Sequence, residues 1–173
     1  MKRIFIALLA LSFGFSANAA TLTADSGWSE FSFANVGNAW SDSFTFTITQ
    51  SSKLTVTDGW QSGDVFEVFS NGTSLGQTSA APTNKFPIIT DYDVAALSPD
   101  FSTRIWTFLA GTYEISGIAV ASPWWTEEFG AGLAALRLDT MSPVPAPAAL
   151  WLLTPPTLFL LGIRRRVKNS IES

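Results

Sequence analysis

Apolar and polar residues alternate at a period of two through much of this chain, and this alternation constrains the fold more than any other feature. In residues 44–49, phenylalanine or isoleucine alternates strictly with threonine. Residues 54–57 repeat the pattern, with Leu54 and Val56 as the apolar members. A period of two places apolar side chains on one face of an extended strand and polar side chains on the other. Both runs therefore predict strands with one buried and one solvent-facing side.

Turn residues separate these runs from further segments that are rich in β-branched and aromatic residues. These segments are residues 28–33, 65–70, 73–77, 103–109, 112–120 and 132–138. The dipeptide Asn71-Gly72 predicts a two-residue hairpin turn in which both residues adopt positive φ. Residues 78–99 contain three prolines and are too long for a hairpin, so we expect them to cross between sheets. No helical period of useful length occurs, and the pattern predicts an all-β, antiparallel β-sandwich of jelly-roll type.

The N-terminus has the features of a secretory signal peptide. Lys2-Arg3 precedes an apolar run over residues 4–15, and the sequence Ala17-Asn18-Ala19 comes soon after it. Small residues at positions 17 and 19 direct cleavage after Ala19, so we expect the mature chain to begin at Ala20. An uncleaved anchor is the alternative, but this apolar run is short of the ~20 residues that cross a bilayer.

The C-terminus carries a short apolar segment between a proline-rich linker and a basic cluster. The three parts are residues 141–147, residues 148–163 and the cluster Arg164, Arg165 and Arg166. The apolar segment is a marginal transmembrane span, because it is short and has two prolines at its centre. The tail of residues 164–173 is expected to stay in the cytoplasm by the positive-inside rule. This orientation places a domain of residues 20–140 on the far side of the inner membrane.

A proline motif stands immediately before the apolar segment. Its residues are Val144, Pro145, Ala146, Pro147, Ala148 and Ala149, and Trp151 follows. With the arginine cluster, this motif resembles a PEP-CTERM sorting tail of the Val-Pro-x-Pro-Ala-Ala subtype. In that family an exosortase, a transpeptidase-like membrane protease of Gram-negative bacteria, cuts the tail and the cargo passes to the cell surface or extracellular matrix. The resemblance implies the exosortase and the secretion machinery as partners, with only transient anchoring in the inner membrane.

Two features of the tail depart from the family pattern. Ala146 stands where the family name has glutamate, and Thr154-Pro155-Pro156 replaces the usual glycine-rich centre. The first departure is common in this subtype, whereas the second bears on how efficiently the tail is processed. A permanent tail anchor is therefore the alternative interpretation.

The body also resembles small sandwich domains found beside sorting tails, and the pre-peptidase C-terminal domains attached to secreted enzymes. The segments that carry this likeness are residues 44–47, 54–58, 63–68 and 111–115. Alternating strands of this kind recur in many sandwiches, so the likeness supports only the fold.

Charge and composition exclude several classes of function. Between residues 20 and 163 there are four basic and thirteen acidic residues, which gives a net charge of minus nine. Such a domain is not expected to bind nucleic acid, whose phosphates require lysine and arginine. The chain has no cysteine and no histidine, which excludes Ser-His-Asp and Cys-His catalysis and the usual zinc sites.

An oxygen-ligated metal remains available, and three aspartates in the long connection form the candidate calcium site. These are Asp91, Asp93 and Asp100. Calcium takes about six to eight oxygen ligands, which carboxylates and backbone carbonyls of a loop can provide. The alternative is a solvated loop in which Asp91 caps a turn. We expect no other cofactor.

Tryptophans in predicted loops are candidates for binding sugars. Trp60, Trp124 and Trp125 form the candidate glycan site, and Trp40 also falls in or near a loop. Exposed indole rings stack on sugar rings, although a buried core position is the usual alternative for a large aromatic residue. Trp28 and Trp106 lie in predicted strands and are expected in the core.

No pair of carboxylates is positioned by the sequence for glycoside hydrolysis, which needs two such groups facing each other about 5.5 Å or more apart. Glu127 and Glu128 are adjacent and point to opposite faces if extended. Glu67 and Glu114 lie in strands and are expected to face solvent. We therefore predict a non-enzymatic, structural or adhesive protein of the cell surface or biofilm matrix. A carbohydrate-binding module for exopolysaccharide is the alternative, and a carboxylate-based hydrolase is a third.

Overall fold

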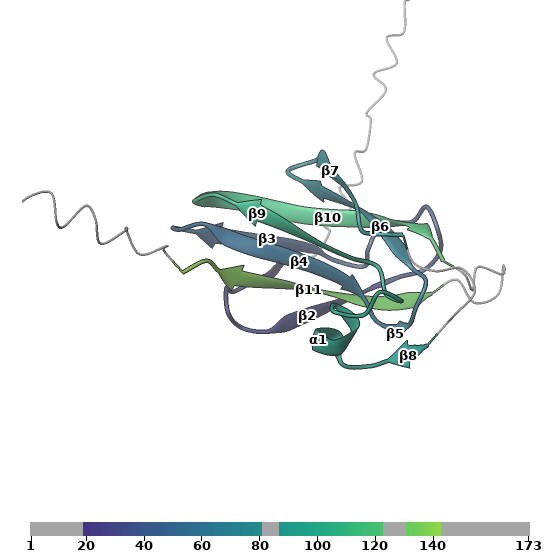
Figure 1. Ribbon diagram of the computed structural model, residues 1–173. Helices are drawn as coiled ribbons and strands as arrows, with labels where there is room; N and C mark the ends of the chain where they lie inside the picture. The colour runs from purple at the N-terminus through teal and green to yellow at the C-terminus, as the bar shows by residue number, and fades with distance from the viewer. Residues whose placement is uncertain (1–18, 81–86, 123–130, 143–173) are drawn as a thin grey trace, which may run out of the picture. The chain divides into compact units, whose positions relative to one another are not determined.

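The computed structural model describes residues 19–80, 87–122 and 131–142, and most of its regular structure is β-strand. The first sheet has the order β1 (Ala19–Thr21), β3 (Ser43–Ile48), β10 (Gly111–Ala121), β6 (Val65–Ser70) and β7 (Thr73–Gln77). The second sheet has the order β2 (Trp28–Phe33), β11 (Gly132–Thr140), β4 (Ser52–Asp58) and β9 (Thr103–Phe108). Figure 1 shows how these strands are arranged. The all-β prediction is confirmed.

The pairing of the strands follows the sequence pattern closely. Neighbouring strands in the two sheets run antiparallel, except that β1 lies parallel to β3. Asn71 and Gly72 join β6 to β7 with φ values of 48° and 76°, which confirms the predicted hairpin. The crossing predicted for residues 78–99 is also confirmed, because β7 belongs to the first sheet and β9 to the second.

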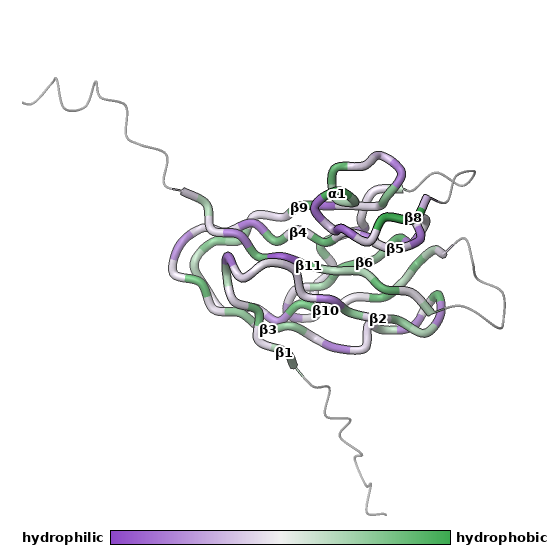
Figure 2. The backbone as a smooth tube through the Cα atoms, turned by 90° about the horizontal axis from the view of Figure 1, so that it is seen from below, coloured by the Kyte–Doolittle hydropathy of each residue, from purple (hydrophilic) through white to green (hydrophobic). Residues whose placement is uncertain are grey.

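Aromatic rings from both sheets meet in the core between them. The Phe66 ring of β6 packs edge-on against Phe31 and Phe33 of β2, with both centroid distances at 5.4 Å. Trp40 stacks on Phe31 at 3.8 Å and is only 6% exposed. The loop-surface interpretation of Trp40 is therefore wrong, because its backbone bridges to Phe33 and its ring completes the aromatic cluster. Figure 2 shows the alternation of hydropathy along the strands that supply these rings.

Side chains of β9 link the edges of the two sheets. The Arg104 guanidinium donates a hydrogen bond of 2.8 Å to the backbone oxygen of Gln77. The Trp106 indole donates one of 3.1 Å to the backbone oxygen of Leu75. Trp106 is partly buried and packs against the core, as expected from its strand.

Three short elements lie together at one end of the sandwich and were not predicted. They are β5 (Trp60–Gln61), β8 (Ile88–Ile89) and the single-turn helix α1 (Tyr92–Ala95) (Figures 1 and 2). β5 pairs with β8, and α1 contacts both β4 and β8. Tyr92 and Ala95 are buried outside the main core cluster, together with Phe101. These elements are too short to leave a period in the sequence.

Several predicted signals lie outside the described residues. These are Ala17, the sorting motif Val144, Pro145, Ala146 and Pro147, the cluster Arg164, Arg165 and Arg166, and Trp124 and Trp125. Ala19 and Ala20 are described, and they pair with Ser43 and Phe44 as part of β1. Within the described ranges, no helix is long and apolar enough to cross a membrane.

Replacement of Gly117 by alanine tests the aromatic core. A Cβ atom there would lie 2.3 Å from two ring carbons of Trp40 and 2.9 Å from the backbone oxygen of Glu67. We expect Gly117→Ala to lower the free energy of unfolding by about 1–3 kcal/mol through overpacking, as measured by urea denaturation. In Gly111→Ala the nearest contact is 3.1 Å from the Tyr113 ring, so this control should lose less. Equal losses in the two variants would contradict the packing described for Trp40.

Candidate functional site

The carboxylate of Asp58 holds a tight segment, residues 59–64, at the end of β4. Asp58 is fully buried, and its Oδ1 accepts a hydrogen bond of 2.7 Å from the backbone N–H of Gly59. Its Oδ2 accepts bonds from the backbone N–H groups of Gly63 at 2.8 Å and Asp64 at 3.1 Å. One side chain therefore satisfies three backbone donors and fixes both ends of the segment.

Trp60 lies inside this segment in an unusual conformation. Its φ is 61°, in the left-handed region that bulky side chains seldom adopt. Its side chain is 46% exposed, although tryptophan is highly buried on average. Backbone strain of this kind costs about 1–3 kcal/mol and persists only where surrounding contacts impose it. Here the bonds to Asp58 and the pairing of Trp60 with Ile89 provide those contacts.

Tyr92 of α1 packs against the segment that carries Trp60. The Tyr92 ring packs so close to Gly59 that a Cβ atom on that glycine would lie 2.2 Å from the ring carbon Cε1. The indole N–H of Trp60 donates a hydrogen bond to the Tyr92 hydroxyl. That hydroxyl in turn donates one of 2.9 Å to Oε1 of Glu30 on β2. Burial, followed by this bond to Glu30, raises the pKa of Tyr92, so the phenol stays protonated as a donor.

Trp28 continues the row of rings onto the outer face of the second sheet. Its ring centroid lies 5.8 Å from that of Tyr92. Arg137, which is directly opposite Trp28 across the β2–β11 pair, places its guanidinium 4.5 Å above the indole ring. The Arg137 guanidinium also forms ion pairs with Asp93 and Asp139. The Trp28 indole N–H donates to Asp93 as well, at 3.2 Å.

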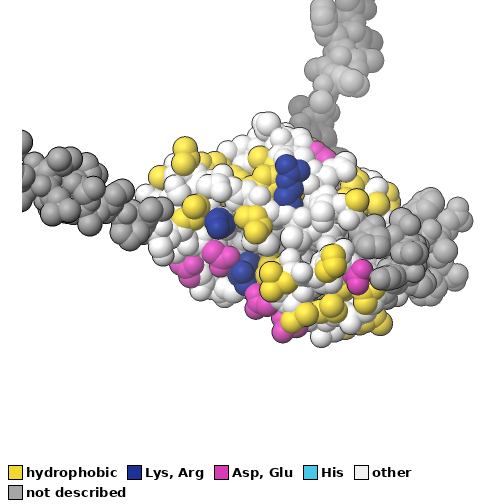
Figure 3. All heavy atoms as spheres, in the orientation of Figure 1, with side chains coloured by type: hydrophobic (Ala, Val, Ile, Leu, Met, Phe, Trp, Pro, Cys, Tyr) yellow, Lys and Arg dark blue, Asp and Glu magenta, His cyan; other side chains and the backbone are white. Residues whose placement is uncertain are grey.

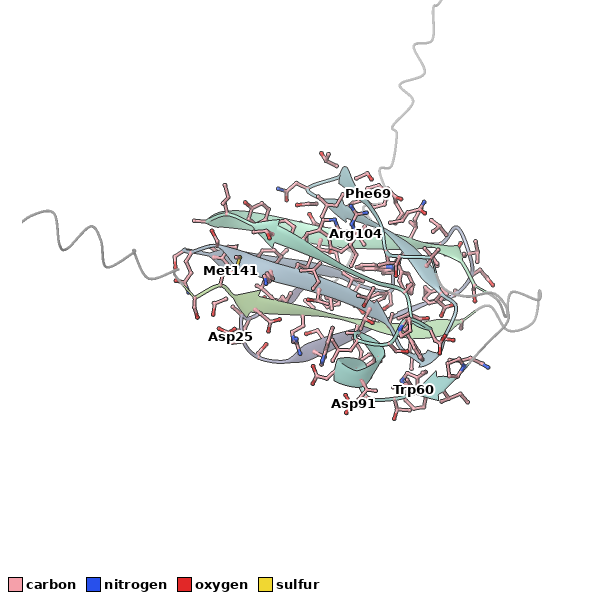
Figure 4. The ribbon with its side chains drawn as sticks, in the orientation of Figure 1. Asp25, Trp60, Phe69, Asp91, Arg104 and Met141 are labelled. Carbon is pink, nitrogen blue, oxygen red and sulfur yellow. The ribbon has the colours of Figure 1, made fainter. Side chains whose placement is uncertain are left out.

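Together Trp60, Tyr92 and Trp28 form what we call the aromatic strip. In Figure 3, apolar side chains gather over the region where Figure 1 places α1 and β8, and acidic side chains border them. Figure 4 places Trp60 and Asp91 at this end of the sandwich and Asp25 at the opposite end. Rings flanked by carboxylates offer an apolar surface for stacking together with hydrogen-bond acceptors. Such a surface can bind a ligand that is apolar on one face and rich in hydroxyl groups at its edge.

Two buried carboxyl groups, those of Asp58 and Asp64, flank the segment that carries Trp60. Burial, and secondly the neighbouring carboxylate of Asp64, raises the pKa of Asp58 to about 8, against the opposing effect of three backbone N–H groups. Burial also raises the pKa of Asp64 to about 6, against an opposing hydrogen bond from Ser122. The two groups interact and therefore titrate as a pair. Because burial disfavours two charges here, the pair retains a proton at neutral pH.

The candidate calcium ligands have other partners in this structure. Oδ1 of Asp91 accepts bonds from the backbone N–H groups of Asp93 and Val94, which makes Asp91 the N-cap of α1. Asp93 is bonded to Arg137 and Trp28, whereas the Asp100 bond is made by its backbone N–H, which donates to the Ser98 hydroxyl at 3.3 Å. Within the part of the chain that the structure describes, no group of three or more acidic residues is placed to hold a metal ion.

The carboxylates considered for hydrolysis are not brought together. Glu67 of β6 lies opposite Ile118, whereas Glu114, four residues earlier on β10, lies opposite Thr45. Four residues along a strand correspond to about 13 Å. The Glu67 carboxylate accepts a hydrogen bond from the hydroxyl of Ser74. Glu127 and Glu128 lie outside the described residues, as do Trp124 and Trp125.

A shallow groove lies beside β1 and β3 on the first sheet. It has a volume of about 590 Å³, and its lining includes Thr21, Thr45, Thr47 and Thr112. The hydroxyl oxygens of Thr47 and Thr112 lie 2.9 Å apart and satisfy each other. Phe46, the aromatic residue of the lining, is only 2% exposed. The groove offers hydroxyl groups without an exposed ring, so the aromatic strip is the stronger candidate site.

Sequence reasoning found Trp60 but missed the other members of the strip. Trp28 was expected in the core, yet it is half-buried on the outer face, so that prediction is wrong. The signal was available, because Phe31 and Phe33 point inward and a period of two then turns Trp28 outward. Tyr92 carried no such signal, since its place against the segment that carries Trp60 depends on contacts between distant segments.

Comparisons with known proteins leave the function to be argued from this geometry. No protein-family model matches the chain, and no curated protein matches it. The pre-peptidase C-terminal domain of a collagenase from Bacillus anthracis is similar at 12% identity, over 70% of this chain and 93% of that one, with a TM-score of 0.40. PliG, a periplasmic inhibitor of g-type lysozyme from Aeromonas hydrophila, is similar at 13% identity, over 73% and 100%, with a TM-score of 0.37. Likenesses of this strength carry no argument about what the chain binds.

The carboxyl pair predicts an unusual dependence of stability on pH. Both folded-state pKa values lie above the ordinary 3.8, so the native state binds protons more tightly than the unfolded state. This contribution to stability is fully present below about pH 4 and is lost as the pH rises through about 6 and about 8. We expect the free energy of unfolding, measured by urea denaturation, to fall by several kcal/mol across this window, because both groups contribute.

Asp64→Asn removes one member of the pair and should flatten this fall. An asparagine at this position can still accept the hydrogen bond from Ser122. Stability that rises with pH between 4 and 9, or the same profile in the variant, would contradict the assignment.

Proposed function

We propose that this chain is an exported, adhesive β-sandwich protein of the cell surface or extracellular matrix, and that the aromatic strip is the surface by which it binds polysaccharide. The observation that carries the proposal is the exposed indole of Trp60, held in a strained, left-handed conformation. Strained backbone is maintained where a side chain must be presented in a fixed way. The role is one of binding, not catalysis.

The chemistry of the strip fits a sugar chain. The exposed indole of Trp60 provides an apolar surface against which the C–H face of a sugar ring packs. Glu30 and Asp93 lie beside these rings and are exposed, and their carboxylates can accept hydrogen bonds from sugar hydroxyls. The fixed row of Tyr92 and Trp28 limits the conformational entropy lost on binding, because these rings are already ordered by their neighbours.

The charge around the strip selects among polysaccharides. Glu30, Asp93 and Asp139 carry three negative charges, and Arg137 carries the one positive charge that pairs with two of them. Like charges repel an acidic chain, such as a uronate polymer. A neutral or amino-sugar polysaccharide is therefore the proposed ligand.

The sorting tail and the order of the strands complete the proposal. Export through the signal peptide, followed by exosortase processing near residues 144–147, delivers the domain to the outside of the cell.

Jelly-roll connectivity is supported by the strand orders. When the eight long strands are numbered in chain order, without β1, β5 and β8, the first sheet has the order 2-7-4-5 and the second has the order 1-8-3-6. Double-sheet jelly rolls of this kind occur in lectin domains.

Removal of the exposed indole tests the binding surface. We expect Trp60→Ala to weaken binding of cellohexaose at least tenfold, since one stacked ring contributes about 1–3 kcal/mol in comparable stacking. Isothermal titration calorimetry would measure the affinity. An acidic probe, an oligoguluronate of the same length, should bind at least tenfold more weakly than cellohexaose to the unaltered protein.

The matched control is Leu97→Ala. Leu97 is 88% exposed and lies just beyond α1 without belonging to the strip. This variant should bind like the unaltered protein. Equal affinities for the Trp60→Ala variant and the unaltered protein would overturn the strip as the binding surface.

Intact mass spectrometry of protein from surface and membrane fractions tests the sorting proposal. We expect surface protein to begin at Ala20 and to end near residues 144–147. Replacement of Arg164, Arg165 and Arg166 by glutamine should reduce the surface form, because the basic stop for the membrane segment is lost. Membrane protein that retains the arginine cluster, with no shortened surface form, would establish a permanent anchor instead.

A further inference from the structure

We propose that the buried Asp58 and Asp64 are the positioning pair of the aromatic strip, which holds residues 59–64 so that Trp60 keeps its outward-facing, left-handed conformation. The inference rests on the proposed function, since it assigns the control of that same site. Neither aspartate touches the ligand in this assignment. Asp58 acts through the backbone that carries Trp60, and Asp64 acts through its charge interaction with Asp58.

The geometry of the segment carries the first step. The side chain of Asp58 receives backbone N–H groups from both ends of residues 59–64, and Trp60 is the second residue of that segment. The backbone N–H of Ser62 also bonds to the carbonyl oxygen of Pro87 at 3.1 Å, which ties the segment to the strand that pairs with Trp60. The segment is therefore closed by one carboxylate and one neighbouring strand, and loss of the carboxylate frees both ends.

A comparison within the molecule supports the second step. Three non-glycine residues have positive φ, namely Asp25, Asn71 and Trp60, within the described residues. Aspartate and asparagine tolerate this region through local hydrogen bonds, whereas tryptophan has no such device. Trp60 therefore depends on bonds made by another side chain. Asp58 supplies them.

The groups packed around the carboxyl groups of Asp58 and Asp64 come from several elements. Tyr92 of α1 faces Asp58, with Glu30 of β2 behind it, and Ser102 before β9 bonds to the backbone oxygen of Asp64. Gly132 of β11 and Ser122 after β10 approach the Asp64 carboxyl group.

No basic side chain pairs with either carboxyl group among the described residues. Loss of the last proton thus leaves two buried negative charges side by side, and their repulsion opposes the closed segment.

The fluorescence of Trp60 distinguishes positioning of this residue from a general effect of the two aspartates on stability. Spectra of each protein minus those of its Trp60→Phe counterpart isolate this indole, and acrylamide quenching reports its exposure between pH 5 and pH 9. We expect the Trp60 signal to be constant at acidic pH and to change above neutral pH, together with at least a tenfold loss of cellohexaose affinity. Asp64→Asn should weaken this response and move it to lower pH, because Asp58 then loses the repulsion of its neighbour while it stays buried.

Asp58→Asn provides the second variant. Its amide nitrogen cannot accept a backbone N–H, so the segment should open and the Trp60 signal should differ at every pH. Asp25→Asn is the matched control, because Asp25 accepts bonds from the backbone N–H and hydroxyl of Thr140 at the other end of β11. This control should leave the Trp60 signal and the affinity unchanged.

The outcomes separate this inference from the proposed function. A Trp60 signal that responds to pH and to Asp58→Asn without any sugar binding supports the positioning pair and overturns the ligand. Sugar binding that is independent of pH and survives both Asp58→Asn and Asp64→Asn overturns the positioning pair and leaves the function intact. An Asp25→Asn variant that alters Trp60 as strongly as Asp58→Asn would also overturn the inference.

Discussion

The register of β11 between β2 and β4 is the constraint on which both faces of the second sheet depend. It turns Leu136 toward the core, where this residue is fully buried. The next residue, Arg137, faces outward and lies directly opposite Trp28. A slip of one residue would exchange the two faces and turn the core residues Ala134, Leu136 and Leu138 toward solvent. The pairing that builds the core therefore also places Trp28, one member of the aromatic strip, on the outer face.

The alternation in the sequence was sufficient to predict most of the long strands and to show that each has one buried and one solvent-facing side. The hairpin at Asn71-Gly72 was equally predictable, because asparagine and glycine supply positive φ locally. Trp28 was misplaced because its hydrophobicity was given more weight than its position in the period. Trp40 was misplaced for the opposite reason, since it lies between strands, where no period indicates that its ring stacks on Phe31.

The rest of the site could not be read from the sequence, because it depends on contacts between distant segments. Helix α1 is a single turn capped by Asp91, and one turn contains no repeat to detect. Trp60 adopts its conformation through Asp58, which is close in sequence, and through Tyr92 and Ile89, which are not. The close approach of Tyr92 to Gly59 is likewise a tertiary contact. Residues of this kind acquire their role only when the fold is complete.

Features that destabilise the folded domain are concentrated around Trp60. The core between the sheets packs apolar rings in mutual contact, and the Trp40 indole nitrogen is a buried donor there without a hydrogen-bond partner among the described residues. Two further unfavourable features fall within a few residues of each other: a pair of buried carboxyl groups at Asp58 and Asp64, and a left-handed tryptophan between them. Each feature alone destabilises a domain of this size. Their coincidence beside the half-exposed indole of Trp60 fits the inference that stability is given up there to fix the position of this residue, since local rules are broken mainly where function requires it.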